Sequence, residues 1–184
     1  IEEEIKLDYS DVLFRPKRST LKSRKDVDLN RTYTFKYSKF KWRGTPIIAS
    51  NMDGVGEISL AKKLSLYKLM TALTKQHTID QIDSIYKQKG ILNFVALSCG
   101  TNLDSFNRLN KILKKYPKFQ FICIDVANGY SENFSKFVSN IRKKYPNKTI
   151  IAGNVVTADM TQELVLSGAD IVKVGIGPGS VCTT

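Results

Sequence analysis

The sequence predicts an α/β fold organised around a parallel sheet, and three observations support this prediction. Short apolar runs recur along the chain, and each is nearly continuous, as strands buried on both faces are. Amphipathic helical patterns lie between these runs, which favours strand–helix units. Successive runs begin 22 to 29 residues apart, a regular spacing for such units. The six runs are TPIIAS (45–50), LMTALT (69–74), NFVALS (93–98), FQFICIDV (119–126), KTIIAG (148–153) and DIVKVG (170–175).

The segments between the runs show the start and stop signals of helices. Thr78 and Gln81 are spaced for a capping box after the second run. The helix after the third run is expected to stop before Pro117, and the same letters, Lys-Lys-Tyr-Pro, recur at 143–146 to close the next helix. An apolar stripe at helical spacing accompanies each signal. The stripes are Ile79, Ile82, Ile85 and Tyr86; Phe106, Leu109, Ile112 and Leu113; and Phe134, Phe137, Val138 and Ile141.

Two architectures fit this alternation: an open doubly wound sheet and a β/α barrel. Residues 1–44 precede the first run and are expected to form an extended or hairpin lid. Residues 45–184 supply six β/α units, whereas a (β/α)8 TIM barrel needs eight units and about 250 residues. For a barrel, we therefore expect residues 1–184 to be a single domain that forms the N-terminal part of a longer polypeptide.

The composition is typical of a globular protein, and we expect no membrane-spanning helix in it. Hydrophobic residues make up 42% of the 184 positions, and no apolar run approaches the roughly 20 residues of a membrane helix. The acidic start, IEEEIKLDYS, lacks the apolar core of a signal peptide. Three cysteines without short-range pairing argue against a disulfide framework, and the absence of C-x-x-C argues against zinc. We therefore expect a cytoplasmic protein.

The charge balance favours anionic partners. The chain has 29 basic and 17 acidic residues, a net charge of +12. Nucleic acid and a phosphorylated small molecule both fit this charge. The lysines, however, sit in pairs at predicted helix ends such as 114–115 and 143–144, rather than in one stripe interleaved with aromatic residues. We therefore predict a small-molecule substrate, and neither nucleic acid nor a membrane as a partner.

Polar side chains follow the predicted strands, where the chemistry of parallel α/β folds is found. Each also has an ordinary structural interpretation: Asp53 as a helix cap, Lys75 as a solvated strand end, and Asp125 as the partner of a neighbouring lysine. Taken together, a carboxylate, an amine and a thiol at one rim favour a functional site. The residues expected at this rim are Asp53, Lys75, Asp125, Asn154 and Cys182.

Two further residues lie inside the predicted strands. Cys123 falls within the fourth run and is expected in the core. Lys173 falls within the sixth run, and a buried lysine must be paired. We favour an ion pair at Lys173 over a functional role.

The last ten residues, GIGPGSVCTT at 175–184, crowd three glycines in front of a cysteine. A dinucleotide-binding fingerprint is disfavoured because no helix pattern follows the glycines, and a P-loop is excluded because no Gly-Lys-Ser/Thr occurs. What remains is a flexible loop whose carbonyl groups could hold a cation. Its thiol, at Cys182, could be activated by a nearby lysine.

Five segments, quoted at the end of this paragraph, together resemble the IMP dehydrogenase / GMP reductase family, and within it the reductases. The cysteine loop is common to both enzymes of the family. Two other features favour a reductase: only the helix of residues 78–90 stands where dehydrogenases usually carry a regulatory insertion, and DVANGYS replaces a segment that in dehydrogenases usually contains histidines. The resemblance implies a β/α barrel assembled as a homotetramer. The segments are RPKRSTLKSR (15–24), SNMDGVG (50–56), DVANGYSENF (125–134), AGNVVTADM (152–160) and LSGADIVKVGIGPGSVCTT (166–184).

The resemblance implies a reductive deamination that serves purine interconversion and salvage. GMP would lose its 2-amino group as ammonia, and NADPH would supply a hydride to C2, which gives IMP. Cys182 would attack C2 and form a covalent thioimidate, which splits the reaction into two easier steps. Thr184 would donate the proton that helps ammonia to leave. Lys75 and Asp125 would complete the catalytic set on the nicotinamide side.

The resemblance also implies binding roles. Ser23 and Arg24 would reach the NADPH of a neighbouring subunit, where an arginine suits phosphate. Within the subunit, the expected NADPH contacts are Lys75, Asp125, Val126, Ala127, Ile176 and Gly177. The nucleotide substrate would contact Met52, Ser180 and Cys182, and a potassium ion would be held by Gly177, Gly179 and Cys182.

Three places depart from the usual family pattern. Gly54 replaces a threonine, Thr74-Lys75-Gln76-His77 replaces His-Lys-His-Tyr, and Cys99 replaces a small hydroxyl residue. Two alternatives to a reductase stay open. One is an IMP dehydrogenase that lacks the regulatory insertion, and the other is a non-catalytic barrel that binds a nucleotide or RNA.

Overall fold

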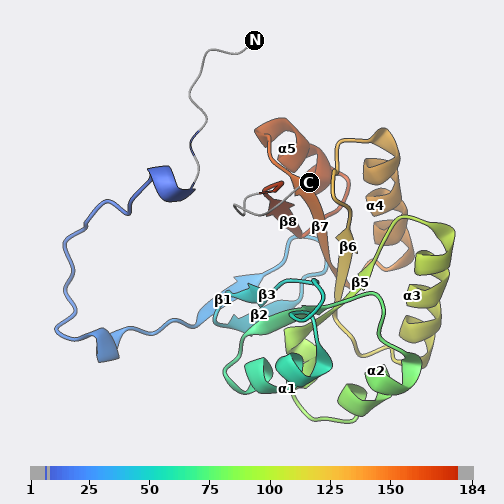
Figure 1. Ribbon diagram of the computed structural model, residues 1–184, viewed down its shortest axis with the longest axis horizontal. Helices are drawn as coiled ribbons and strands as arrows, with labels where there is room; N and C mark the ends of the chain where they lie inside the picture. The colour runs from blue at the N-terminus through green and yellow to red at the C-terminus, as the bar shows by residue number, and fades with distance from the viewer. Residues whose placement is uncertain (1–6, 8, 178–184) are drawn as a thin grey trace.

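The computed structural model describes residue 7 and residues 9–177, which form a curled sheet with helices on its outer side and a long N-terminal arm (Figure 1). Six parallel strands, β3 to β8, pair in sequence order and make half a barrel. The predicted fold class is confirmed, and each strand lies within or overlaps one of the six apolar runs. The strands are β3 (Ile48–Ala49), β4 (Met70–Leu73), β5 (Val95–Cys99), β6 (Phe121–Asp125), β7 (Thr149–Val155) and β8 (Ile171–Val174).

A helix follows each of the strands β3 to β7 and covers the outer face of the sheet (Figure 1). The expected capping box forms at the start of α2: the Gln81 N–H donates to Thr78 Oγ1 at 3.3 Å, and the Thr78 N–H donates to Gln81 Oε1 at 2.8 Å. None of the helices in the described residues is long and apolar enough to cross a bilayer. The helices are α1 (Ile58–Leu66), α2 (Ile79–Tyr86), α3 (Leu103–Lys115), α4 (Glu132–Lys144) and α5 (Ala158–Leu166).

The sheet separates two apolar layers, because alternate side chains of a strand point to opposite faces. The outer layer packs the strands against the helices, as Ile122 and Ile124 of β6 do. The inner layer fills the half-barrel and contains Phe121 and Cys123 of the same strand. Cys123 is only 1% exposed, so its predicted place in the core is confirmed.

An antiparallel hairpin of β1 (Arg31–Thr34) and β2 (Lys41–Gly44) closes one end of the half-barrel. Its aromatic side chains enter the inner layer: Phe35 and Phe40 meet the ring of Phe121 edge-on, with ring centroids 5.8 and 5.7 Å apart. Phe121 is the first residue of β6, so the hairpin lies at the amino ends of the strands. It therefore leaves the opposite end, where the strands finish, uncovered.

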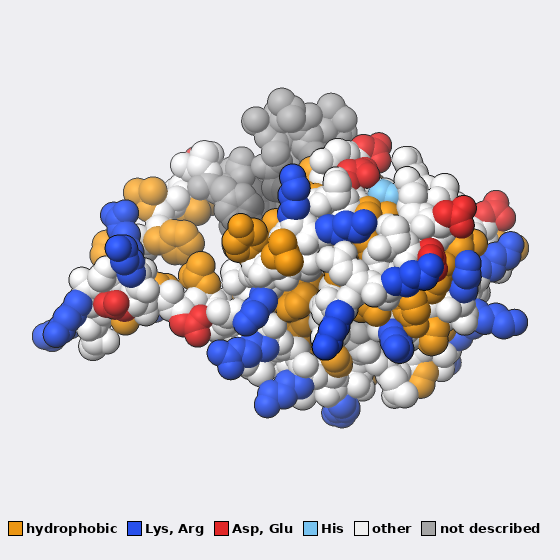
Figure 2. Space-filling view, turned by 90° about the horizontal axis from the view of Figure 1, so that it is seen from below, with side chains coloured by type: hydrophobic (Ala, Val, Ile, Leu, Met, Phe, Trp, Pro, Cys, Tyr) orange, Lys and Arg blue, Asp and Glu red, His pale blue; other side chains and the backbone are white. Residues whose placement is uncertain are grey.

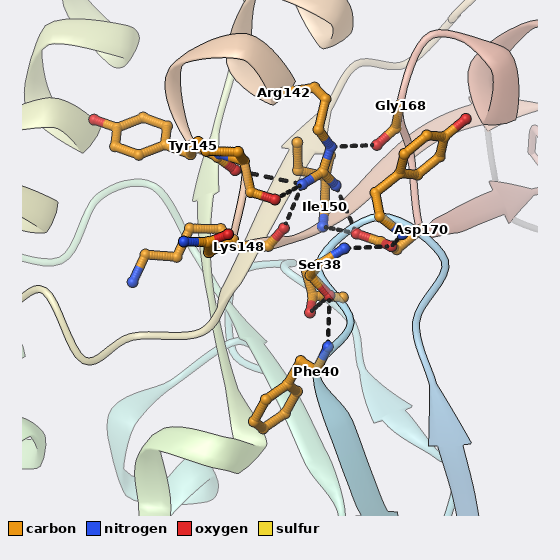
Figure 3. Close-up of polar contacts among 12 residues, drawn as sticks. Ser38, Phe40, Arg142, Tyr145, Lys148, Ile150, Gly168 and Asp170 are labelled. Atoms are coloured by element: carbon orange, nitrogen blue, oxygen red, sulfur yellow. Dashed lines mark hydrogen bonds and ion pairs between the residues drawn. The ribbon is translucent and has the colours of Figure 1, made fainter.

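A buried ion pair fixes the hairpin to the sheet (Figure 3). Asp170 has a fully buried side chain, and its Oδ2 lies 2.6 Å from Nη2 of Arg142 in α4. The same carboxylate accepts hydrogen bonds from the N–H groups of Tyr37, in the hairpin turn, at 2.9 Å and of Ile150 at 3.1 Å. The guanidinium group also donates to backbone carbonyl groups around it. Those carbonyl groups belong to Gly168, Tyr145, Pro146 and Lys148.

Lys and Arg side chains are scattered across the face of the molecule shown in Figure 2, with neutral and apolar groups between them. Two lysines form i, i+4 ion pairs along helices α2 and α4. Lys136 lies 2.9 Å from Glu132, and Lys87 lies 2.6 Å from Asp83. Exposed pairs of this kind add little to stability.

Candidate active site

A cavity of about 440 Å³ opens where β3, β4, β5 and β6 finish, on the side of the sheet away from the hairpin. Its lining includes Met52, Asp53, Lys75 and Asp125, which come from three different loops and strand ends. A second cavity of about 330 Å³ is lined by Asn154 and by residues 171–175 of β8 and its end. Asn51 lines both cavities. Of the described residues that the sequence places at this rim, Asp53, Lys75 and Asp125 thus share one cavity, and Asn154 lines the second.

Asp125, at the end of β6, is held by a lysine of β8, the next strand but one in the sheet. Lys173 Nζ of β8 donates to Asp125 Oδ1 and to Asn51 Oδ1, the latter at 3.2 Å. The ion pair predicted for Lys173 is confirmed. It is partly exposed, with 27% of the lysine side chain and 35% of the aspartate side chain accessible to solvent. The second carboxylate oxygen of Asp125 remains an acceptor that a ligand in the cavity can use.

Lys75 and Met52 present their side chains to solvent at the same cavity. Met52 is 63% exposed, and Lys75 is exposed directly after β4. Within residues 9–177, no hydrogen bond or ion pair engages the ammonium group of Lys75. An ammonium group without a protein partner beside a polar cavity can bind an anion or an electron-rich ring nitrogen. Asp53 does not cap α1, whose N-cap residue is Glu57.

The loop after β6 is tied to the end of β7 by backbone hydrogen bonds. The Val126 N–H donates to the Gly153 carbonyl at 2.9 Å, and the Asn154 N–H returns a bond to the Val126 carbonyl at 2.9 Å. The side-chain amide of Asn154 donates to the carbonyl of Gly175 at 2.9 Å. Asn154 therefore links the segment of Val126 and Ala127 to the start of the glycine loop.

Tyr130 adds a second connection between these loops, which the sequence did not indicate. Its phenolic oxygen accepts hydrogen bonds from the N–H groups of Val156 at 3.0 Å and Thr157 at 2.9 Å. A hydrogen bond with the Thr157 hydroxyl, together with these two backbone bonds, lowers the pKa of the Tyr130 phenol. A tyrosine in a loop is too common a feature for its sequence position alone to reveal such a contact.

The glycine loop begins with backbone that favours glycine. Gly175 has a φ of 130° and Gly177 a φ of 58°, values that side chains with a Cβ rarely adopt. Ile176 and Gly177 are half-buried next to the second cavity, which Gly175 lines. The other predicted residues of this loop, namely Gly179, Ser180, Cys182 and Thr184, lie outside the described residues.

Comparison with known proteins assigns the chain to a family. Residues 6–184 match a family model described as "IMP dehydrogenase / GMP reductase domain". The chain belongs to the IMP dehydrogenase / GMP reductase family. The membership predicted from the quoted segments is thereby confirmed.

The proteins similar to this family member include some named GMP reductase and one named inosine 5'-monophosphate dehydrogenase. The chain is 55% identical to a curated protein named GMP reductase from Klebsiella pneumoniae, and 54% identical to proteins of that name from Vibrio atlanticus and Citrobacter koseri. Each match covers 100% of the chain and 54% of the relative, so the chain spans about half the length of these curated relatives. Among solved structures, an inosine 5'-monophosphate dehydrogenase from Legionella pneumophila is similar, with a TM-score of 0.78 and 30% identity; the match covers 97% of the chain and 53% of that protein.

Ser23 and Arg24 of this family member belong to the N-terminal arm, and neither lines the two cavities at the rim. Ser23 caps a short 3-10 helix, Arg24–Asp26: the Lys25 N–H donates to Ser23 Oγ at 3.2 Å, and the Ser23 N–H donates to Asp26 Oδ2 at 3.0 Å. The structure does not bring the two residues to the cavity of their own chain. Contact with the cofactor of a neighbouring subunit stays a prediction.

The two described cysteines are both free and buried. Burial raises the pKa of the Cys99 thiol to about 12 and that of the Cys123 thiol to about 11. Cys99 ends β5 and packs into the outer apolar layer, although it also borders the cavity of about 440 Å³. Neither thiol is therefore a good nucleophile, because the thiolate is the reactive form.

We expect Cys99 and Cys123 to resist alkylation in the native protein. Burial raises the pKa of the Cys99 thiol to about 12, so the reactive thiolate is scarce at pH 8, and burial also limits access of the reagent. Treatment with iodoacetamide followed by peptide mass spectrometry should label both residues only in denaturant. Labelling of either residue in the native protein at the rate of an unhindered thiol would contradict this.

Proposed function

We propose that the full-length protein is a GMP reductase, which converts GMP and NADPH to IMP, ammonia and NADP⁺. One observation carries the proposal: over its whole length the chain is 53–55% identical to curated proteins named GMP reductase. Its identity to the dehydrogenase from Legionella pneumophila is lower, at 30%. Within one family, this difference supports the reductase reaction over the dehydrogenase reaction.

In this proposal, the rim would hold the nucleotide substrate beside a nicotinamide cofactor. The cavity of about 440 Å³ is within the usual range for small-molecule sites. Lys75 and Asp125 would face the nicotinamide, with Val126, Ala127, Ile176 and Gly177 beside it. NADPH, when bound, supplies the hydride. A neighbouring subunit would extend this site with its residues Ser23 and Arg24.

The protein's own residues would carry the covalent chemistry. Cys182 would attack C2 of the purine as a thiolate, while Met52 contacts the ring and Ser180 lies near the nucleotide phosphate. Thr184 would protonate the departing amine, and ammonia leaves with the C–N bond electrons. The purine then remains bound to the Cys182 sulfur as a thioimidate. The C–S bond breaks once C2 has received the hydride, which restores the thiolate and releases IMP.

The proposal is tested by comparing two assays on the purified full-length protein. A GMP reductase oxidises NADPH when GMP is added and releases ammonia in equal amount. An IMP dehydrogenase reduces NAD⁺ when IMP is added, and the Legionella pneumophila structure makes this the second candidate. Activity in the first assay and none in the second is the expected result. The reverse outcome would replace the proposal with the second candidate, and inactivity in both would favour a non-catalytic barrel.

We also propose a potassium ion in the glycine loop, held by the carbonyl groups of Gly177 and Gly179 and by Cys182. The positive φ of Gly177 supports this, because such backbone can turn carbonyl groups toward a common centre. Potassium is therefore expected to raise the turnover of the full-length protein above that in sodium or lithium buffer. Equal turnover in all three buffers would contradict the potassium site.

The proposed enzyme is a cytoplasmic homotetramer that binds neither nucleic acid nor membranes. The N-terminal arm supports assembly, because Leu13 is 98% and Phe14 103% exposed within a single chain. Adjacent large apolar side chains in full contact with water favour a protein interface.

On the face shown in Figure 2, the Lys and Arg side chains are dispersed, which supports the absence of a continuous binding site for a nucleic-acid backbone there. Free Cys99 and Cys123 are compatible with a reducing compartment.

A further inference from the structure

Two loops at the rim meet at the backbone of Gly56. One loop follows β3 and carries Met52; the other follows β4 and carries Lys75. The Gly56 carbonyl oxygen accepts a hydrogen bond from the Thr74 N–H at 3.0 Å and another from Nε2 of His77 at 2.9 Å. Both ends of the four-residue turn that contains Lys75 are thus bound to the same oxygen atom.

The other side of Gly56 is fixed to Met52. The Gly56 N–H donates to the Met52 carbonyl at 2.8 Å. A Cβ at position 56 would lie 2.6 Å from the Ala72 carbonyl oxygen and 2.9 Å from the Thr74 nitrogen, so the two backbones touch with no room for a side chain. The position of Met52 is therefore coupled through one glycine to the position of Lys75.

His77 is held on more than one side. Its side chain is only 6% exposed, and Glu57 Oε2 lies 3.8 Å from the same Nε2. A carbonyl oxygen can only accept, so Nε2 must carry the proton in the bond to Gly56. From α3, the guanidinium group of Arg108 donates to the backbone carbonyl of His77. His77 thus joins the β3 loop through its ring and α3 through its backbone.

We infer that His77 is a positioning residue, whose imidazole N–H sets the place of Lys75 relative to Met52 and so to the substrate. This inference rests on the proposed function, in which Lys75 faces the nicotinamide and Met52 the purine. The side chain of Lys75 is exposed and is not held by packing. Its position therefore depends on the backbone, which the neighbouring residues fix. The bond from the Thr74 N–H fixes one side, and the bond from the His77 ring fixes the other. Displacement of a reacting group by about 1 Å can cost 10²-fold in rate.

Two variants of similar size separate the contribution of the His77 hydrogen bond to activity from the contribution of its packing. His77→Gln keeps an N–H donor close to the place of Nε2, whereas His77→Met has a similar length and no donor. In the full-length protein, we expect His77→Met to lower kcat for GMP-dependent NADPH oxidation by about 10–100-fold, with the KM for GMP changed much less. His77→Gln should restore most of kcat. Amide hydrogen exchange at residues 74–77 should be faster in His77→Met than in His77→Gln.

The outcomes distinguish this inference from the proposed function. If the wild-type protein oxidises NADPH with GMP but the two variants have the same kcat, the positioning role of His77 is wrong and the proposed function stands. If both variants lose the same thermal stability and keep the kcat of the wild type, His77 contributes only packing, and the positioning role is likewise wrong. If the wild-type protein has no activity with GMP, the proposed function fails, and the role of His77 in that reaction fails with it.

Discussion

Replacement of Cys182 by alanine in the full-length protein is expected to reduce GMP-dependent NADPH oxidation and ammonia release to trace levels. The substitution removes the sulfur atom that would bond to C2 of the purine, so neither half of the reaction has its covalent intermediate. Loss of the nucleophile in a covalent enzyme typically costs 10⁴-fold or more in kcat, and we expect about that size here. Steady-state assays of NADPH absorbance and of ammonia measure it.

Two other variants test whether the loss is specific to this thiol. Cys123→Ala should retain the chemistry, because that thiol is buried and its pKa is raised to about 11. Thr184→Ala keeps the Cys182 thiol and loses the proton donor, so ammonia release should slow by about 10²–10⁴-fold. Hydride transfer between IMP and NADP⁺ needs no amine departure and should suffer less. Turnover in Cys182→Ala close to that of the wild type would end the covalent mechanism.

Replacement of Asp170 by alanine is expected to lower the free energy of unfolding by about 3–5 kcal/mol, the usual effect of removing one partner of a buried ion pair. The variant leaves the Arg142 guanidinium group without its carboxylate in a nearly buried position, where only 13% of the arginine side chain is exposed. It also removes the acceptor for the N–H groups of Tyr37 and of Ile150, the second of which Figure 3 shows. Urea unfolding followed by circular dichroism measures the change.

Lys136→Ala is the matched control for Asp170→Ala. It breaks the pair with Glu132, in which 69% of the lysine side chain and 86% of the glutamate side chain are exposed. Such a pair contributes about 0.3–0.5 kcal/mol within a helix. If both variants lose the same small amount of stability, the Arg142–Asp170 pair does not anchor the hairpin.

Most of the fold could be predicted because buried parallel strands leave a strong local pattern. A strand covered on both faces must be apolar throughout, so runs such as FQFICIDV could be located without knowing their neighbours. The anchoring of the hairpin could not be found in this way. Tyr37 and Asp170 are 133 residues apart, and neither stands in a pattern that indicates its partner.

The sequence predicted which residues lie at the rim, but it did not predict most of the hydrogen bonds that hold them there. Asp125 and Lys75 were placed at one rim because the carboxyl ends of parallel strands meet at the same edge. Lys173 was predicted to be a paired lysine because its apolar run was expected to be buried, although its second partner, Asn51, was not predicted. In the sequence, His77 is the single histidine and part of a departure from the family pattern. Its bond to Gly56 depends on how two loops fold together, which no local pattern encodes.

Transfer of a deuterium label tests the central claim, reductive deamination of GMP at C2, most directly. The full-length protein is given GMP and NADPH that carries deuterium at the transferable position of the nicotinamide, and the product is analysed by mass spectrometry and NMR. The proposed function predicts IMP with deuterium at C2 and ammonia in equal amount. Unlabelled product, or label without release of ammonia, would contradict it.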